Sequence, residues 1–129
     1  DTDLSGVVYH ANYLRWFERA RSDMLRCLGI DQRAAQEAGE GAYAVTDLSI
    51  RYARPARLDD DVLIRSVTTE IRHAWCRIHQ SAWRGEELLA EARVRAAFVS
   101  PDGRPRRQPA EWVAAFSSKV QPETGTTTE

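Results

Sequence analysis

The sequence of 129 residues lacks several features that would assign it to a common class of protein. No apolar run approaches the roughly 20 residues that a membrane-spanning helix needs, and no signal peptide is visible. Lysine is almost absent, so arginine supplies nearly every positive charge, and the formal net charge is −1. A chain without a basic surplus has no general attraction for nucleic acid. We therefore expect no transmembrane segment and no nucleic-acid partner.

The residue types that mark metal, redox and nucleophile sites are also scarce or badly spaced. Cys27 and Cys76 stand far apart, which argues against a zinc site or a redox dithiol. Both cysteines are expected to be buried as small apolar side chains. We expect them to be reduced, which agrees with a cytoplasmic location. The three histidines show no metal-ligand spacing. There is no Gly-rich phosphate loop and no Gly-x-Ser-x-Gly elbow, so neither a metal nor a cofactor is indicated.

The hydrophobic periodicity predicts an α+β domain. Apolar residues recur at helical steps first, and period-two alternation follows in four later segments. The expected helices are 12–28, 32–38 and 110–116, and the expected strands are 42–53, 62–72, 74–84 and 88–100. Short turns imply an antiparallel sheet of strands in hairpin succession, wrapped around the long first helix. We expect one domain over residues 1–120 and a disordered polar tail at 121–129.

The first thirteen residues hold the strongest candidate for a site. Asp1 and Asp3 precede a turn at Gly6, and His10 stands where the long helix is expected to begin. The unpaired amides of a helix start can polarise a carbonyl oxygen, and a nearby carboxylate can attack the carbon or activate water. Residue types alone favour a solvated loop whose acids cap the helix, because Asp before a helix is common.

Two further clusters allow more than one interpretation. Arg104, Arg106 and Arg107 lie in a Pro-rich turn, where they form either a solvated loop or a contact for the phosphates of a nucleotide-bearing ligand. Trp75 and Trp83 share the polar face of one expected strand, which favours a subunit interface over base stacking.

The segment from Asp1 to Leu14, with the Phe17-Glu18-Arg19-Ala20-Arg21 that follows, closely resembles the hotdog-fold acyl-CoA thioesterases of the tol-pal-associated (YbgC-like) group. These proteins are relatives of 4-hydroxybenzoyl-CoA thioesterase. The similarity continues through 52–60 and 102–107, and it spans nearly the whole domain. The combination of Asp-x-x-Gly-Val-Val-Tyr-His with Tyr-x-x-Pro-Ala is specific, well beyond a single short motif.

The resemblance implies hydrolysis of an acyl-CoA to a free acid and CoA, without metal or redox cofactor. Asp3 matches the family's catalytic acid and acts as nucleophile or as general base, and His10 matches its motif histidine. The implied substrate contacts are Gly6, Val7, Val8, Tyr9 and Tyr13, and the implied contacts for CoA phosphates are Arg104, Arg106 and Arg107. The family's opening strand is expected upstream of Asp1. A homodimer or homotetramer with active sites between subunits is implied, and acyl carrier protein is a further candidate partner.

Two other functions stay open on the residues alone. The chain could be a non-catalytic hotdog protein that binds acyl-CoA or acyl carrier protein, although the retained Asp3 argues against this. It could also be a hotdog hydratase or dehydratase, because Asp3 and His10 could serve such a reaction. Acyl-chain length cannot be inferred, since two chains would build the pocket.

Overall fold

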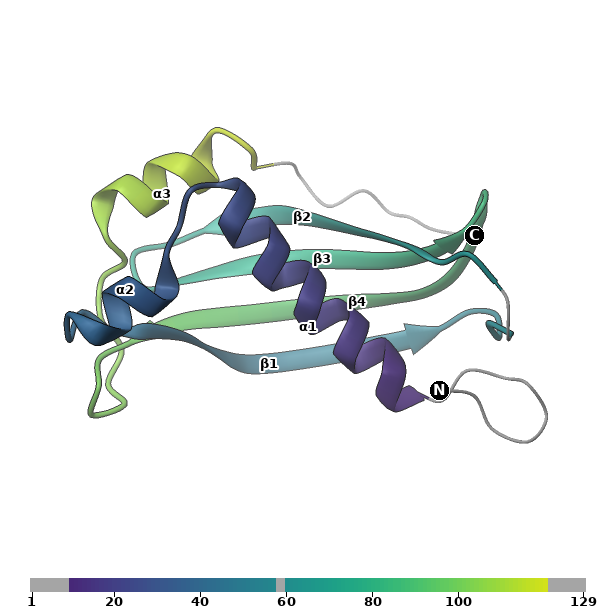
Figure 1. Ribbon diagram of the computed structural model, residues 1–129, viewed down its shortest axis with the longest axis horizontal. Helices are drawn as coiled ribbons and strands as arrows, with labels where there is room; N and C mark the ends of the chain where they lie inside the picture. The colour runs from purple at the N-terminus through teal and green to yellow at the C-terminus, as the bar shows by residue number, and fades with distance from the viewer. Residues whose placement is uncertain (1–9, 58–59, 121–129) are drawn as a thin grey trace.

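The computed structural model describes residues 10–57 and 60–120, and within these ranges it is a helix packed on one antiparallel sheet (Figure 1). The long helix α1 spans His10–Cys27, and the short helix α2 spans Gln32–Glu37. The strands follow as β1 (Ala42–Tyr52), β2 (Leu63–Ile71), β3 (Trp75–Arg84) and β4 (Glu87–Val99), and helix α3 covers Ala110–Ser117. The predicted elements are therefore confirmed to within a few residues. The expected tail at 121–129 lies outside the described residues.

The strand order differs from the predicted hairpin succession. The sheet runs β1-β4-β3-β2, so β1 pairs with β4 and makes no ladder with β2. The β2–β3 and β3–β4 hairpins are as expected. The prediction was wrong for β1 because its turn was treated as a hairpin. Pro55 follows the end of β1, and the chain then crosses the end of the sheet to reach the opposite edge.

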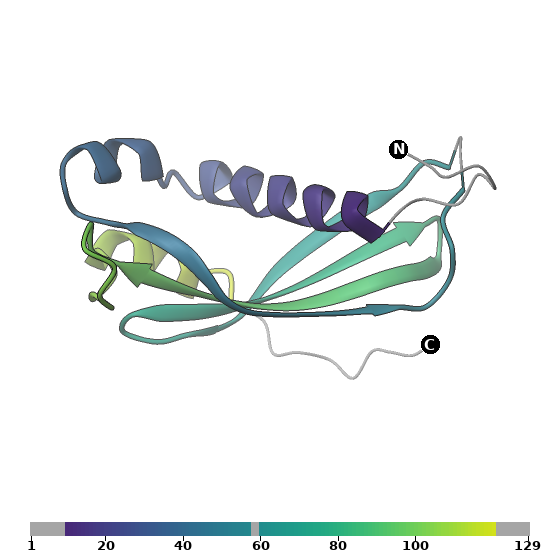
Figure 2. The ribbon, with the colours of Figure 1, turned by 90° about the horizontal axis from the view of Figure 1, so that it is seen from below.

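One face of the sheet carries all the described helices (Figure 2). The alternation predicted for β3 is confirmed, because Cys76, Ile78 and Ala82 are buried towards α1. From α1, Phe17 and Leu25 enter the same core. At the far end of that face, the rings of Trp112 and Phe116 from α3 pack against Tyr43 and Phe98. The opposite face is the polar one, as predicted.

Only one of the two cysteines is buried. Cys76 lies in the core, and burial raises the pKa of its thiol to about 12. Cys27, the last residue of α1, is exposed, so the prediction of two buried cysteines was wrong at this position. It was wrong because Cys27 lies off the apolar stripe of α1, on which Leu25 and then Leu28 face the core.

A buried polar contact fixes α1 on the sheet. Gln80 of β3 is fully buried, and its Nε2 donates to the carbonyl of Phe17 at 2.8 Å and to Ser66 Oγ at 2.9 Å. Its Oε1 accepts from the guanidinium of Arg21 at 2.8 Å. A buried amide whose groups are all paired adds orientation to the non-directional packing around it. The contact sets the position of α1 along β3, and so the place where the helix begins.

Candidate active site

The predicted site segment lies mostly outside the described residues. Asp3, Gly6, Val7, Val8 and Tyr9 are among residues 1–9, and His10 is described through its backbone alone. That backbone nevertheless settles one expectation, because α1 begins at His10. The first N–H groups of the helix have no intrahelical partner and carry the positive end of its dipole. Free N–H groups of this kind therefore lie at the start of α1, about His10.

Tyr13 lies in the first turns of α1 and is turned inward. Its side chain is 2% exposed, and its ring meets Trp16 edge-on at 5.3 Å and Tyr52 at 5.5 Å between centroids. Its hydroxyl forms no hydrogen bond within the described part of the chain. Burial raises the pKa of this hydroxyl, the nearby Arg84 lowers it, and the nearby Tyr52 and Asp60 raise it. A neutral phenol with a spare donor therefore sits beneath the helix start.

The end of β1 lies beside the start of α1, where Tyr52 contacts Tyr13. Tyr52 is the last residue of β1, and its ring contact with Tyr13 ties that strand end to the first turns of α1. Both views of the ribbon show α1 beginning at the end of the sheet where β1 stops and the β3–β4 turn lies (Figures 1 and 2). The two tyrosines thus form an aromatic wall beside the helix start.

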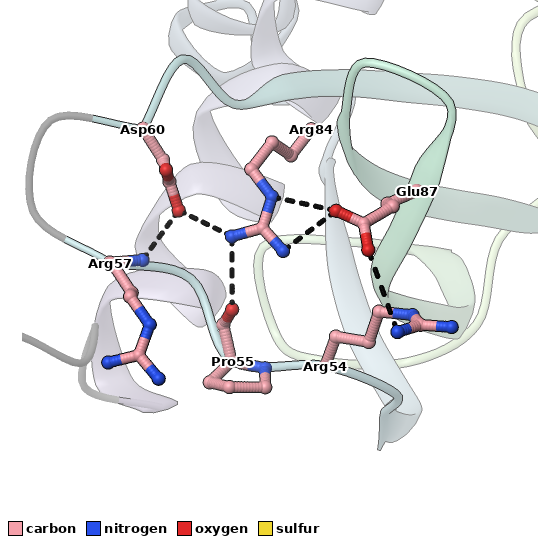
Figure 3. A network of polar contacts seen from close by, with 6 residues as sticks. All are labelled: Arg54, Pro55, Arg57, Asp60, Arg84 and Glu87. Carbon is pink, nitrogen blue, oxygen red and sulfur yellow. Dashed lines mark hydrogen bonds and ion pairs between the residues drawn. The ribbon is translucent and has the colours of Figure 1, made fainter.

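A network of charges that the sequence analysis missed lies at this end of the sheet (Figure 3). Arg84, the last residue of β3, contacts Glu87 Oε1 through Nε at 3.0 Å and through one terminal nitrogen at 2.9 Å. Its other terminal nitrogen donates to Asp60 Oδ2 at 2.8 Å and to the carbonyl of Pro55 at 3.4 Å. Asp60 Oδ2 also accepts from the backbone N–H of Arg57 at 2.6 Å. Glu87 lies 3.5 Å from Arg54.

The network favours the ionised form of Asp60. The backbone N–H of Arg57 and the guanidinium of Arg84 hold the pKa of Asp60 below its ordinary value. The sequence offered two signals for this network: the acidic run 59–61, and an arginine and a glutamate three residues apart across a hairpin. Nothing in that spacing pairs Arg84 with Asp60, because the two lie 24 residues apart.

The predicted arginine cluster lies at the other end of the sheet. It follows β4, whose last residues pair with the first residues of β1, so about ten residues of strand, roughly 30 Å, separate it from the helix start. Arg106 is occupied locally, since it donates to the carbonyls of Gly39 and Glu40 at 3.1 and 2.7 Å. Arg104 is exposed and lies 3.7 Å from Asp102.

Arg107 lines a shallow cavity of about 400 Å³ with Arg72 and His73 of the β2–β3 turn and with Gln108. Here the structure brings cationic side chains from two separate loops to one place. Within residues 10–57 and 60–120, no three His, Cys, Asp or Glu side chains gather as they would around a metal ion. No helix in the described ranges combines the length and apolar character needed to cross a membrane.

Comparison with known proteins agrees with this geometry. A family model described as the thioesterase superfamily matches residues 5–96. The acyl-CoA thioester hydrolase YbgC of Escherichia coli is 40% identical over 118 residues, covering 90% of this chain and 87% of the relative. The acyl-CoA thioesterase YbgC of Haemophilus influenzae is 39% identical over 99 residues, covering 77% and 73%.

Among solved structures, the probable thioesterase from Bartonella henselae superposes with a TM-score of 0.76 at 35% identity, covering 83% of this chain and 89% of that one. The α+β hotdog fold and the resemblance to YbgC-like thioesterases are both confirmed. The chain belongs to the thioesterase superfamily.

Proposed function

We propose that this chain hydrolyses acyl-CoA thioesters to a free acid and CoA, with Asp3 and His10 at the reacting centre. The observation that carries the proposal is the start of α1 at His10, seven residues after Asp3. A helix start offers free N–H groups to the oxygen that becomes negative as the thioester carbon turns tetrahedral. The relatives from E. coli and H. influenzae carry the same activity in their names.

The reaction needs one carboxylate and one water. Asp3 either attacks the thioester carbon, which expels the CoA thiolate and leaves an acyl-aspartyl anhydride for water to hydrolyse, or takes a proton from water as that water attacks. In both routes the C–S bond breaks, CoA leaves with a proton, and the acid keeps an oxygen from water. His10 orients the substrate or the water. Gly6, Val7, Val8 and Tyr9 supply further contacts to the substrate.

The aromatic wall of Tyr13 and Tyr52 contacts the acyl group. The buried ring of Tyr13 and that of Tyr52 meet at the beginning of α1, where an acyl group would extend from the polarised carbonyl. The unpaired hydroxyl of Tyr13 supplies one hydrogen-bond donor to this otherwise apolar surface. An apolar pocket with a few polar groups is the usual form of a small-molecule site.

For the CoA phosphates we propose the arginines that follow β4, with Arg107 as the leading candidate and Arg104 beside it. Arg107 shares its cavity with Arg72 and His73, and clustered guanidinium groups suit phosphate oxygens. Arg106 is the weakest of the three because two backbone carbonyls already engage it. Since this cluster lies far from the helix start of its own chain, it would serve the active site of a second copy.

That arrangement requires a homo-oligomer, either a dimer or a tetramer, with sites between subunits. We place it in the cytoplasm, which agrees with two free cysteines. Acyl carrier protein is a second candidate carrier of the acyl group, and association with the tol-pal system is proposed from the likeness to YbgC alone.

The test is release of CoA thiol from a panel of short, long and aromatic acyl-CoAs. We expect Asp3→Asn to lose at least about a hundredfold in kcat, as loss of a catalytic nucleophile or base commonly does. Asp23→Asn, which changes an exposed acid further along α1 paired with Arg26, should leave kcat unchanged. Equal activity of wild type and Asp3→Asn would remove Asp3 from the mechanism.

Two outcomes would favour the other functions. Saturable binding of acyl-CoA without thiol release by the wild type points to a binding protein. Hydration of an enoyl-CoA without thiol release points to a hydratase.

A further inference from the structure

The β3–β4 hairpin carries more charged contacts than its turn requires. Gly85 and Glu86 form a tight turn between strands whose backbones already pair up to Arg84 and Glu87. A cross-strand ion pair between these two residues would be ordinary. Arg84 instead also contacts the side chain of Asp60 and the carbonyl of Pro55, both in the crossing loop between β1 and β2, of which the structure describes residues 53–57 and 60–62. The guanidinium therefore joins the hairpin to a loop that follows a different strand.

Beyond its first residues, the crossing loop is joined to the sheet by the contacts of Arg84. The backbone N–H groups of Ala53 and Arg54 donate to the carbonyl of Leu89, and the side chain of Ala56 is buried. Farther along, the described contacts that join the loop to the sheet run through Arg84, whereas Asp60 bonds back to Arg57 within the loop. Arg84 thus ties Pro55 and Asp60 of the loop to the hairpin.

The end of β1, from which the loop starts, lies against the beginning of α1. The ring of Tyr52, the last residue of β1 before the loop, contacts Tyr13. The charge of Arg84 lowers the pKa of the Tyr13 hydroxyl and that of Asp60 raises it. The Arg84 side chain is 30% exposed and that of Asp60 is 20% exposed, so their pairing is partly sheltered from water. A fixed loop here holds the inward-facing Tyr13 and, through it, the first turn of the helix.

We propose that Arg84 is a positioning residue for the thioesterase reaction, holding the crossing loop and Tyr13 so that the start of α1 faces the reacting carbonyl. This inference rests on the proposed function. Arg84 itself touches neither substrate nor Asp3 in the proposal, and it acts through Asp60, Pro55 and the aromatic contact of Tyr52 with Tyr13. Planar guanidinium geometry is required, because one ammonium cannot reach Glu87, Asp60 and the Pro55 carbonyl together.

The test compares Arg84→Met with Arg77→Met. Arg77 lies on the same strand and pairs with Glu70 at 3.1 Å, far from the helix start. We expect Arg84→Met to lower kcat by about tenfold or more with KM within about twofold, because a misplaced oxyanion donor weakens transition-state binding and leaves substrate binding in place. Arg77→Met should keep kcat within about twofold at a similar thermal midpoint.

Two further measurements separate positioning from loss of folded protein. Arg84→Lys should recover only part of kcat, and added guanidinium ion at millimolar concentration should raise kcat of an Arg84→Ala variant but not of Arg77→Ala. Asp60→Asn should lower kcat as Arg84→Met does, and the double variant should lose little more than either single change.

Equal kcat in Arg84→Met and Arg77→Met, or a fall in kcat that only follows the folded fraction, overturns the inference. A wild-type protein without thiol release would instead remove the proposed function, so the two failures are distinguishable.

Discussion

On the face of the sheet that no described helix covers, Glu91 links three strands through its side chain. It lies on β4 and is 3% exposed, although it is a carboxylate. Nε of Arg51 on β1 donates to its Oε2 at 2.9 Å, with a second contact from the same guanidinium, and Nε2 of His79 on β3 lies 3.0 Å from its Oε1. A buried carboxylate needs such partners. Three strands are therefore joined through one side chain.

The pH dependence of stability should reveal this carboxylate. Burial raises the pKa of Glu91, but hydrogen bonds from His79 and Arg51 outweigh burial and leave the pKa below its ordinary 4.5. A depressed pKa in the folded state stabilises the protein above about pH 4.5, and this contribution disappears as pH falls through the folded-state pKa. We expect Glu91→Gln to lower the free energy of unfolding by about 1–2 kcal/mol at neutral pH, measured by urea denaturation.

The difference between wild type and Glu91→Gln should then shrink as the pH is lowered below about 4.5. Glu86→Gln, in the exposed β3–β4 turn, is the matched control and should change little at any pH. A difference for Glu91→Gln that stays constant through the acid range would mean that another contact, and not the ionised carboxylate, stabilises this face.

At the scale of elements, the start of β1 depends on a glycine. Gly41 has φ of +135°, and a Cβ built on it would lie 2.2 Å from the carbonyl oxygen of Val99 on β4. We expect Gly41→Ala to lower the free energy of unfolding by about 2 kcal/mol or more, from a strained backbone and a forced shift of the strand pair. Gly39→Ala, at φ of +77° in open space, should cost only about 1 kcal/mol. Equal losses in urea denaturation would contradict the close approach to Val99.

The bounds and faces of these elements could be predicted because they are local. Alternation in β3 assigned Cys76 and Ile78 to the core, as observed, since only one face of the sheet is covered by helices. The pairing of β1 with β4 could not be predicted, because the order of strands along the sequence does not determine their order in the sheet. The network of Arg84 and Asp60 was missed for the same reason: its members meet only when the sheet order brings the crossing loop under the hairpin.

The candidate site was predicted by a different route. The helical period predicted the long helix over 12–28, and the observed α1, His10–Cys27, starts about two residues earlier. The role of Asp3 came from resemblance to a family, and the phosphate contact of the arginines after β4 came from their clustering in a Pro-rich turn; both stay predictions. Sequence spacing could not assign those arginines to the active site. In the single chain they lie at the end of the sheet opposite the helix start, so only a second copy could bring them there.

At the scale of the whole molecule, the open edge of β1 supports the proposed oligomer. Among the strands that the structure describes, β1 pairs with β4 alone. Of its eleven residues, Val45, Leu48 and Tyr52 are exposed, with Leu48 at 42%. A long edge strand with apolar side chains favours pairing with another strand, and a twofold axis would let two β1 edges pair with each other. Such a pairing would bring the arginines of one copy towards the helix start of the other.

Leu48→Glu should therefore weaken self-association, because it places two like charges close to the axis. We expect the dissociation constant to rise by about tenfold or more in sedimentation velocity over a range of concentrations, with the circular dichroism of the folded chain unchanged. Leu63→Glu, on the other edge strand β2 where Leu63 is also exposed, is the matched control and should associate like the wild type. If Leu63→Glu dissociates the protein and Leu48→Glu does not, the subunits meet at β2, and the arginines after β4 lose their route to a partner's active site.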